Sequence, residues 1–377
     1  MEKRAFQKFK EIPAMLGMGC MRFQTDAQEK IKFAENCELI DFLYASGVTY
    51  YDTAWVYHAG KSEDFVKKAL VERYPRESFQ IADKFPVWEV RAPEDVQRIF
   101  HEQLDRLGGS YIDFYLLHAL SGNSWETCKK YGLYEYQKKL QEQGLIKYRG
   151  FSFHGTTPEL KTILDESQFD FVQLQINYYD WEDYARDQYE LATSYGLPVI
   201  VMEPVRGGTL SKPTPEVEEL LRAVEPGQSP SQLALRWVGM LQNVPVVLSG
   251  MTLMEHAREN VETFSPLAPL NETQLSQMAL AQKAIRKRPI VPCTGCNYCR
   301  DCPSGVSIPD VFAAFNEYIS FESKSAARWK YIIELPAVHR AHNCTECGTC
   351  VEMCPQSLDI PKELKRAEDC FHKIGIL

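Results

Sequence analysis

Three short apolar runs each end in a polar residue able to carry a charge or a proton. Asp52 follows VTYY, Lys84 follows FQIAD and His118 follows IDFYLL. Tyr57 lies five residues beyond Asp52, in the segment that comes next. If the runs are neighbouring parallel strands, their carboxyl ends meet at one edge and bring the four side chains together.

Such a group has a physical use in moving a proton. An ammonium at Lys84 favours an ionised phenol and lowers the pKa of Tyr57 from its ordinary value of about 10. Asp52 pairs with Lys84 and holds the charge in place, while His118 orients a carbonyl oxygen and shares in proton donation. Each residue alone has an ordinary explanation, as a helix cap, a surface lysine or a packed histidine. Their common position after successive strands favours a catalytic site.

Cysteines form a second chemical signal. The chain has 12 cysteines, and eight of them fall within 293–354. The run CTECGTCVEMCP at 344–355 has the spacing C-x2-C-x2-C-x3-C-P, which is typical of [4Fe–4S] ferredoxins. The run CTGCNYCRDCP at 293–303 has two residues, not three, before its last cysteine. Paired CxxC units also bind zinc, but two runs of four closely spaced cysteines, each ending in Cys-Pro, favour clusters.

By analogy with two-cluster ferredoxins, the fourth cysteine of each run serves the other cluster. One cluster then takes Cys293, Cys296, Cys299 and Cys354. The other takes Cys344, Cys347, Cys350 and Cys302. The four scattered cysteines, Cys20, Cys37, Cys128 and Cys370, are interpreted as ordinary thiols.

The elements that must position these residues alternate between strands and helices. Eight strand candidates are rich in β-branched and aromatic residues. They are 14–20, 48–52, 79–84, 112–118, 148–153, 171–176, 198–203 and 244–249. Amphipathic segments separate them, among them 29–47, 62–74, 93–108 and 230–242. The pattern predicts an α/β fold, a (β/α)8 TIM barrel; an open doubly wound sheet is the alternative, weakened because no GxGxxG follows the first strand.

The composition changes after about residue 285. A linker at 285–292 precedes the cysteines, and an internal repeat aligns CPSGVSIPDVF (302–312) with CPQSLDIPKEL (354–364). The segment 310–335 between the two has helical character. We therefore predict two domains, a barrel over 1–285 and a small, mainly helical ferredoxin-type domain over 286–377.

The order and spacing of DTAWVY (52–57), ADK (82–84) and LLHAL (116–120) resemble the Asp, Tyr, Lys, His tetrad of the aldo-keto reductase family. The segments 13–23, 144–155 and 229–237 resemble its first strand, fifth strand and last long helix. This resemblance covers roughly residues 10 to 285, and implies a reductase using NADP or NAD, with Tyr57 as the proton donor to a carbonyl oxygen. The C-terminal region resembles the helical ferredoxin modules of respiratory iron–sulfur subunits.

The same resemblance implies a set of cofactor-binding residues. They are Gly19, Cys20, Met21, Ser152, Gln173, Met202, Pro204, Arg206, Gly207, His256 and Asn260. Phe153 stands where the family often has Asn, Met202 where it has a stacking tyrosine, and His256 or Arg258 where a cation contacts the adenosine 2′-phosphate. The choice between NADPH and NADH stays open. Four aromatic residues are candidates for lining the substrate site, namely Trp55, Phe85, Trp88 and Tyr178.

Composition excludes several classes of function. A net charge of −9 argues against a nucleic-acid partner or an anionic membrane surface. The N-terminus lacks a signal-peptide core, and no run of about 18 apolar residues is present. We expect a cytoplasmic protein with a small carbonyl substrate and a ferredoxin-like or flavodoxin-like redox partner.

Three functions remain open from the sequence. The first is a carbonyl reductase whose two [4Fe–4S] clusters exchange electrons with a partner. The second is a reductase with structural or oxygen-sensing clusters. The third is an electron-transfer protein whose barrel only serves for docking. Hydride carries two electrons and a cluster carries one, so the two chemistries do not couple directly.

Overall fold

A computed structural model describes residues 1–293, 295, 299–354 and 358–377. Within these ranges the chain packs as two compact units. Unit 1 comprises Met1–Gly207 and Ser231–Leu270, and unit 2 comprises Gly208–Pro230 and Asn271–Leu377. This division by packing differs from the sequence boundary predicted at 285, because α8 (Pro215–Arg222) packs on α11 (Glu272–Arg286).

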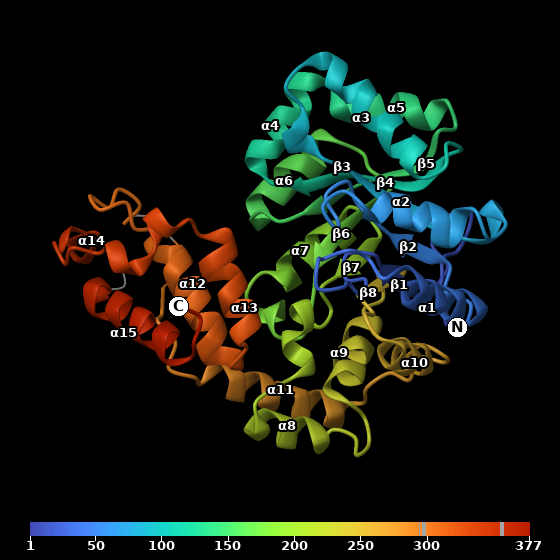
Figure 1. Ribbon diagram of the computed structural model, residues 1–377. Coiled ribbons are helices and arrows are strands. Elements are labelled where there is room, and N and C mark those ends of the chain that lie inside the picture. Colours follow the sequence, from blue (N-terminus) through green and yellow to red (C-terminus); the bar gives the residue numbers. More distant parts are fainter. Residues whose placement is uncertain (294, 296–298, 355–357) are drawn as a thin grey trace. The chain divides into compact units, whose positions relative to one another are not determined.

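Unit 1 is built on a closed barrel. In the described part of the chain, parallel strands β1 to β8 pair in chain order, and β8 pairs with β1 (Figure 1). The strands are β1 (Leu16–Gly19), β2 (Tyr50–Asp52), β3 (Gln80–Phe85), β4 (Ile112–Leu120), β5 (Ile146–Phe153), β6 (Phe171–Gln175), β7 (Val199–Met202) and β8 (Val246–Ser249). All eight predicted strands are confirmed, and the open-sheet alternative is wrong.

Helices follow the strands of unit 1. They are α1 (Phe33–Ala45), α2 (Ser62–Val66), α3 (Pro93–Arg106), α4 (Gly122–Tyr131), α5 (Leu133–Glu142), α6 (Thr157–Glu166), α7 (Ala185–Ser194), α9 (Pro230–Gly239) and α10 (Met254–Thr263). Local sequence explains where they begin. At α6, the Glu159 carboxylate accepts a hydrogen bond from the Thr156 amide at 2.7 Å, which closes the first turn.

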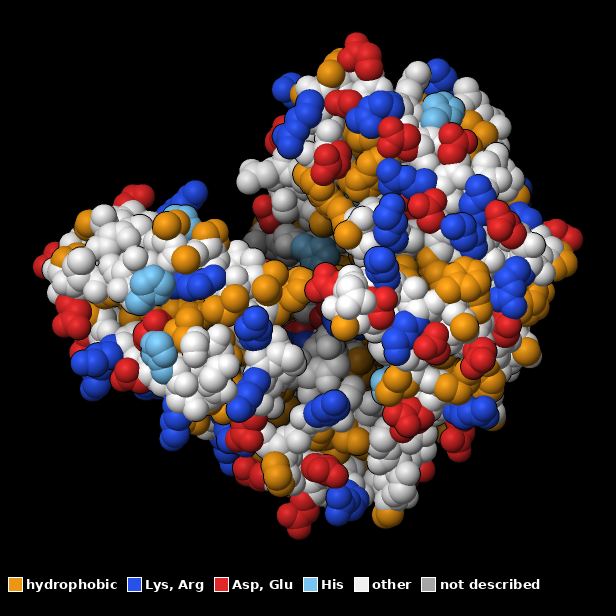
Figure 2. Space-filling model, in the orientation of Figure 1, with side chains coloured by type: hydrophobic (Ala, Val, Ile, Leu, Met, Phe, Trp, Pro, Cys, Tyr) orange, Lys and Arg blue, Asp and Glu red, His pale blue; other side chains and the backbone are white. Residues whose placement is uncertain are grey.

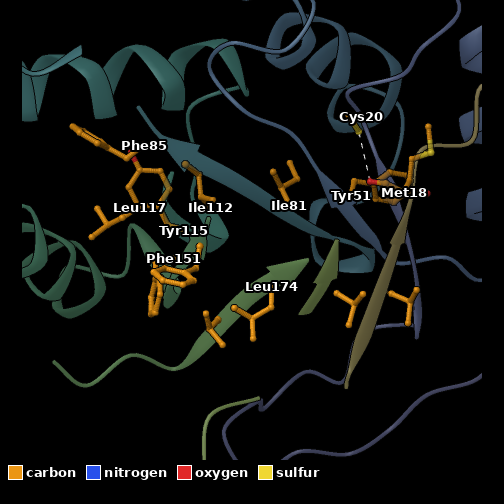
Figure 3. Close-up of a cluster of buried hydrophobic side chains, with 14 of the residues drawn as sticks. Met18, Cys20, Tyr51, Ile81, Phe85, Ile112, Tyr115, Leu117, Phe151 and Leu174 are labelled. Atoms are coloured by element: carbon orange, nitrogen blue, oxygen red, sulfur yellow. Dashed lines mark hydrogen bonds between the residues drawn. The ribbon is translucent and has the colours of Figure 1, made fainter. Parts of the chain in front are cut away.

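Strand residues alternate between two apolar layers. Tyr50, Ala82, Phe114, Phe171 and Val246 fill the barrel interior in one buried cluster. Their neighbours along the strands pack outward in another, and Figure 3 shows some of these outward residues: Tyr51, Ile81, Tyr115, Leu117 and Phe151. Because side chains alternate along a strand, any residue two positions beyond an interior one also points inward. This alternation decides which predicted site residues face the barrel lumen.

Aromatic rings close one end of the lumen. Phe9, which precedes β1, packs at 5.2 Å against Phe114, at 5.1 Å against Tyr148 and at 6.4 Å against Phe171. Gly150 makes room for Phe171, because a Cβ there would lie 2.5 Å from the phenylalanine ring. The interior layer is thus filled at the amino ends of the strands, which leaves the carboxyl ends for chemistry.

Unit 2 is helical. Besides α8 and α11 it contains α12 (Ile308–Phe321), α13 (Lys324–Arg328), the π-helix η6 (Trp329–Glu334), α14 (Thr349–Glu352) and α15 (Ile360–Lys373). The internal repeat is visible here, since α12 and α15 both begin at an Ile-Pro pair. The helical segment predicted at 310–335 is broken, because Glu322 adopts a left-handed conformation with φ 54°. Phe371 of α15 packs on Tyr331 at 4.2 Å and on Phe315 at 6.3 Å, which forms a separate small core.

The surface carries charges of both signs. On the face drawn in Figure 2, lysine and arginine side chains are interspersed with aspartate and glutamate. In the described part of the chain, no helix combines the length and apolarity needed to cross a bilayer.

Candidate functional site

The four residues predicted to act together lie side by side at the carboxyl ends of β2, β3 and β4. Asp52 ends β2, Lys84 lies near the end of β3 and His118 lies in β4; each is two positions beyond an interior residue and so points into the lumen. Tyr57 lies in the loop between β2 and α2. All three strand residues are buried, with Lys84 only 1% exposed. The predicted grouping of these side chains is therefore what the fold produces.

Lys84 is the centre of this group. Its Nζ donates to Asp52 Oδ1, to the Thr53 carbonyl oxygen at 2.8 Å and to the Tyr57 hydroxyl at 3.2 Å. Burial lowers the pKa of Lys84, but Asp52 and Tyr57 oppose this effect and the pKa is raised overall. The lysine therefore keeps its positive charge beside the phenol.

The phenol of Tyr57 departs from the sequence expectation. Burial raises its pKa, and the Lys84 ammonium opposes that effect without overcoming it, so the pKa lies above its ordinary value. The predicted lowering of the pKa was wrong in its net direction, because the cost of burying a phenolate was not counted. A phenol that stays protonated at neutral pH can still donate its proton.

His118 completes the group. Its ring centroid lies 6.1 Å from that of Tyr57 in an edge-to-face arrangement. Burial, and then the nearby positive charge of Lys84, lower the pKa of His118 well below its ordinary value. The imidazole is therefore neutral at physiological pH, and its buried Nδ1 has no hydrogen-bond partner among the described residues. A neutral imidazole in this position can donate a hydrogen bond to a carbonyl oxygen.

Two predicted cofactor residues lie in the same lumen. Ser152 and Gln173 are register partners on β5 and β6, and both are buried. The Ser152 hydroxyl accepts a hydrogen bond from the Ala119 amide at 2.8 Å. Gln173 Nε2 contacts the Met202 sulfur at 3.5 Å, while its Oε1 is buried without a partner in the described chain. This unsatisfied oxygen fits a nicotinamide carboxamide, whose N–H groups would supply the missing donor.

The other predicted cofactor residues lie at the ends of β1, β7 and β8. Cys20 is buried, and its side chain points outward to the apolar layer seen in Figure 3, so only its backbone is available to a ligand. Met21 is 51% exposed, and Gly19 and Pro204 lie at strand ends.

Side chains near β7 and β8 already have partners within unit 1. Arg206 contacts Asp180 at 3.2 Å and lies beside Gly207. His256 Nδ1 accepts from the Leu253 amide at 3.4 Å, Asn260 donates to the Ser249 hydroxyl at 2.8 Å, and Arg258 lies over the Phe42 ring at 5.0 Å. Their roles toward a nucleotide remain predictions.

Only some of the candidate aromatic residues border the site. Trp88 lies 5.1 Å from the His118 ring and is 41% exposed, as a substrate-lining residue would be. The prediction that Phe85 lines the substrate site was wrong, because its position in β3 turns the side chain outward, into the layer shown in Figure 3. Trp55 lies beneath the Arg106 guanidinium at 3.9 Å and packs against the outer core. Tyr178 is buried.

Sequence reasoning missed the residues behind the lumen wall. Asp83 precedes Lys84 and, by strand alternation, points the other way, where it meets Glu63 of α2 and Gln103 of α3. The signal was present in the sequence, since an aspartate within an apolar strand must be buried with a partner. Arg22 was also missed; it follows β1, and its side chain lies next to Gly250 and Gly207.

The cysteine centre belongs to unit 2. Cys296 lies outside the described residues, so its predicted role is untouched by the structure. Burial raises the pKa of the Cys350 thiol to about 11, and the charges of Cys344, Cys302 and Cys347 add to that rise. Cys350 and the three thiols that act on its pKa are those predicted to share one cluster across the two runs. Cys293, Cys299 and Cys354 pack at the edge of the small core of unit 2.

A zinc ion and a four-iron cluster require different arrangements of their cysteine ligands. A single zinc ion binds sulfur at about 2.3 Å, which requires its ligands to converge tightly. Among the described residues, no three cysteine, histidine or carboxylate side chains converge on a single-ion site. A four-iron cluster also takes four cysteines, arranged around a larger body. Gly295 and Gly348 have positive φ angles of 68° and 78° and shape the two loops.

Comparisons with known proteins match both parts of the chain. The family model "Aldo/keto reductase family" matches residues 15–282, and the model "4Fe-4S dicluster domain" matches residues 292–359. The uncharacterized oxidoreductase YqkF of Bacillus subtilis is 24% identical over 66% of this chain and 86% of its own length. A probable aldo-keto reductase 1 of Glycine max is 34% identical, but only over 36% of this chain and 40% of its own length.

Solved structures agree on the fold. The holo form of aldo-keto reductase AKR11C1 from Bacillus halodurans is 25% identical, with a TM-score of 0.61 over 74% of this chain and 96% of its own. An aldo-keto reductase from Klebsiella pneumoniae in complex with NADPH is 21% identical, with a TM-score of 0.59 over 74% of this chain and 95% of its own.

Proposed function

Because the chain belongs to the aldo/keto reductase family and carries a 4Fe-4S domain, we propose that this oxidoreductase reduces the carbonyl group of a small aldehyde or ketone with NADPH or NADH. Tyr57 gives its proton to the carbonyl oxygen. The observation that carries the proposal is the hydrogen bond from the Lys84 ammonium to the Tyr57 hydroxyl at 3.2 Å, inside a buried ion pair with Asp52.

The residues of the chain divide the work. A bound nicotinamide supplies the hydride. Lys84 stabilises the phenolate that Tyr57 becomes after donation, and Asp52 holds Lys84 charged and in place. His118, which is neutral, orients the carbonyl oxygen. Ser152 and Gln173 hold the carboxamide of the nucleotide, for which the unpartnered Gln173 oxygen provides the acceptor.

The similar Klebsiella aldo-keto reductase was solved in complex with NADPH, and this favours NADPH as the first nucleotide to test. Arg22, beside Gly207 and Gly250, is a cation available to an anionic cofactor. His256 and Arg258 are both engaged elsewhere in unit 1, by a helix cap and by the Phe42 ring. We propose that the chain tolerates NADH as well.

Tyr57→Phe tests the proposal. The hydroxyl is lost while the ring is kept, so kcat for 4-nitrobenzaldehyde reduction should fall by about 10²–10⁴-fold, the range expected for a general acid. Nucleotide binding, measured by protein fluorescence quenching, should stay within about twofold, because no hydride-side contact is removed. Tyr131→Phe is the matched control, since its hydroxyl donates to the Arg91 carbonyl at 3.0 Å and the residue is not one of the four at the site. Unchanged kcat in Tyr57→Phe would contradict the proposal.

For the C-terminal region we propose two [4Fe–4S] clusters that exchange single electrons with a ferredoxin-like or flavodoxin-like partner. The effect of Cys302, Cys344 and Cys347 on the pKa of Cys350 supports one of these clusters. Cys293, Cys296, Cys299 and Cys354 would hold the other. Removing iron with a chelator under anaerobic conditions should abolish electron uptake from reduced methyl viologen, while aldehyde reduction by NADPH survives. Loss of both activities would instead tie the clusters to the barrel chemistry.

A further inference from the structure

Two carboxyl groups are buried against each other directly behind the proposed catalytic lysine. Asp83 of β3 and Glu63 of α2 are both 0% exposed. Each carboxyl group is among the causes that shift the pKa of the other. The amide nitrogen of Gln103 lies 2.7 Å from Asp83 Oδ2 and 3.0 Å from Glu63 Oε1, so one donor bridges both groups. We refer to Asp83 and Glu63 as the carboxyl pair.

Two buried carboxyl groups that share one amide donor repel each other when both are ionised, which favours a proton on one of them. The charged and titratable neighbours of the pair do not supply enough positive charge to replace this proton. Arg106 of α3 contacts Glu63 Oε2 at 3.0 Å and is itself shared with Glu102, while Tyr115 of β4 donates to Gln103. The Lys84 ammonium is on the lumen side; only its backbone amide reaches Asp83, at 2.9 Å. One arginine therefore faces two buried carboxyl groups, which is balanced when they carry a single negative charge.

The carboxyl pair joins the two elements that carry the proposed acid and its activator. Lys84 follows Asp83 in β3. Glu63 lies in the first turn of α2, six residues after Tyr57, at the end of the loop that carries the phenol. The same loop is held by Ser62, whose hydroxyl donates to the Cys20 carbonyl at 3.0 Å, and by Trp55 beneath Arg106. A shift of α2 from β3 would therefore move Tyr57 away from Lys84.

We propose that Asp83 and Glu63 share one proton and together act as a buried latch that positions Tyr57 against Lys84, and that loss of this proton at alkaline pH opens the latch. Both residues are positioning residues, since neither reaches the lumen. When the proton leaves to solvent base, two carboxylates remain in contact in a site with one arginine, and their repulsion separates α2 from β3. This inference rests on the proposed function, through Tyr57 and Lys84.

The pKa of Asp83 supports the proposal that the pair shares a proton. Burial, and then the charge of Glu63, raise the pKa of Asp83 well above its ordinary value. The pair therefore loses its proton at a higher pH than an ordinary carboxyl group does.

Amide variants test the latch, because an amide supplies a permanent hydrogen and needs no proton. We expect Asp83→Asn and Glu63→Gln to reduce 4-nitrobenzaldehyde with NADPH at neutral pH within about threefold of the parent kcat. Their alkaline decline of kcat should begin at higher pH, since only the Tyr57 phenol is left to titrate. Asp83→Ala, which deletes the link, should lower kcat more than tenfold with KM for NADPH unchanged. The control is Asp41→Asn, an arginine-paired carboxylate with a 40% exposed side chain, which should keep the parent profile.

A second readout separates failure of the latch from failure of the proposed function. The phenol of Tyr57 can be followed by ¹³C NMR of tyrosine-labelled protein, with Tyr57→Phe to assign its signal, whether or not the protein reduces any aldehyde. In the parent protein this signal should shift across the alkaline step, and in Asp83→Asn the shift should move to higher pH. A parent signal and kcat profile identical to those of both amide variants would overturn the latch. An inactive parent protein with the predicted NMR shift would overturn the proposed function alone.

Discussion

The two sites of this chain are built differently, and the difference concerns what holds the reacting groups in place. In the barrel, Lys84 is fixed by strand register and by bonds to Asp52, Thr53 and Tyr57. In unit 2 the thiols sit on loops and a short helix, α14, and Cys347 is exposed. The barrel site is organised by its own chain, whereas we expect the cysteine centre to depend on what it binds, because metal binding at such sites is coupled to folding.

The largest effect is expected from the centre of the barrel site. Lys84→Met removes the ammonium that stabilises the Tyr57 phenolate, and kcat for aldehyde reduction should fall by about 10²–10⁴-fold. The iron content should be unchanged, since the cysteine centre does not use this lysine. The measurement is a steady-state assay with parallel iron analysis. The control is Lys61→Met, which changes an exposed lysine in the loop that carries Tyr57. A loss of iron in Lys84→Met would contradict the independence of the two sites.

A cysteine substitution should show the opposite pattern. Cys350→Ser removes one ligand of the proposed second cluster, so iron and acid-labile sulfide should fall by about half. Aldehyde reduction by NADPH should change less than about twofold.

The pairing of cysteines across the two runs can be tested in the same way. Cys302→Ser should reproduce the optical and electron-paramagnetic-resonance changes of Cys350→Ser, because both thiols serve one cluster. Cys354→Ser should instead affect the other cluster. If Cys302→Ser and Cys354→Ser behave in the reverse manner, each run holds its own cluster and the proposed exchange of ligands is wrong.

The sequence predicts features that depend on local signals better than features that depend on the surrounding protein. The strands and the tetrad were predictable because apolar runs, strand alternation and strand ends are all local signals, and Asp52, Lys84 and His118 obey them. The orientation of Phe85 was missed although alternation would have given it: a residue next to inward-pointing Lys84 must point outward. The raised pKa of Tyr57 was not predictable, since it depends on how much protein surrounds the phenol, which no spacing reveals.

The carboxyl pair marks another limit. Asp83 could be identified as a buried acid from the strand in which it lies, but its partner Glu63 is 20 residues away on another element. Only the closure of the barrel brings α2, α3 and β3 together around it. The same holds for Cys350 and the three thiols that act on its pKa, where the two runs were predictable and their proximity came from an analogy.

A smaller effect is expected from a substitution that overpacks the barrel interior. Gly150→Ala places a Cβ 2.5 Å from the Phe171 ring, a contact that the closed layer of rings cannot relieve without shifting. The expected loss in the free energy of unfolding is about 1–3 kcal/mol, typical of overpacking. Chemical denaturation monitored by tryptophan fluorescence would measure it. Gly19→Ala is the control, because its Cβ would meet the Ser249 carbonyl at an ordinary 3.5 Å; equal losses in both variants would rule out the steric explanation.

The smallest effect is expected from His118 near neutrality. Burial and the Lys84 charge lower its pKa well below the ordinary value, so the imidazole stays neutral between pH 8 and pH 6. kcat/KM should therefore show no His118 inflection in that window. The free energy of unfolding should also depend on pH, because the unfolded chain binds a proton at His118 more readily than the folded protein does. The contribution of the buried neutral ring to stability is therefore complete above about pH 6.5 and declines as the pH falls below it.

His118→Gln, which cannot titrate, should remove that acid-side loss of stability. Thermal unfolding of both proteins from pH 5 to pH 8 would measure this, with the difference between them shrinking as the pH falls. An inflection of kcat/KM near pH 6.5 that disappears in His118→Gln would show that the ring is solvated and titrates normally. Water would then reach His118, which is packed between Tyr57 and Trp88. In that case the contrast between an internally organised barrel site and a ligand-dependent cysteine centre would be weaker.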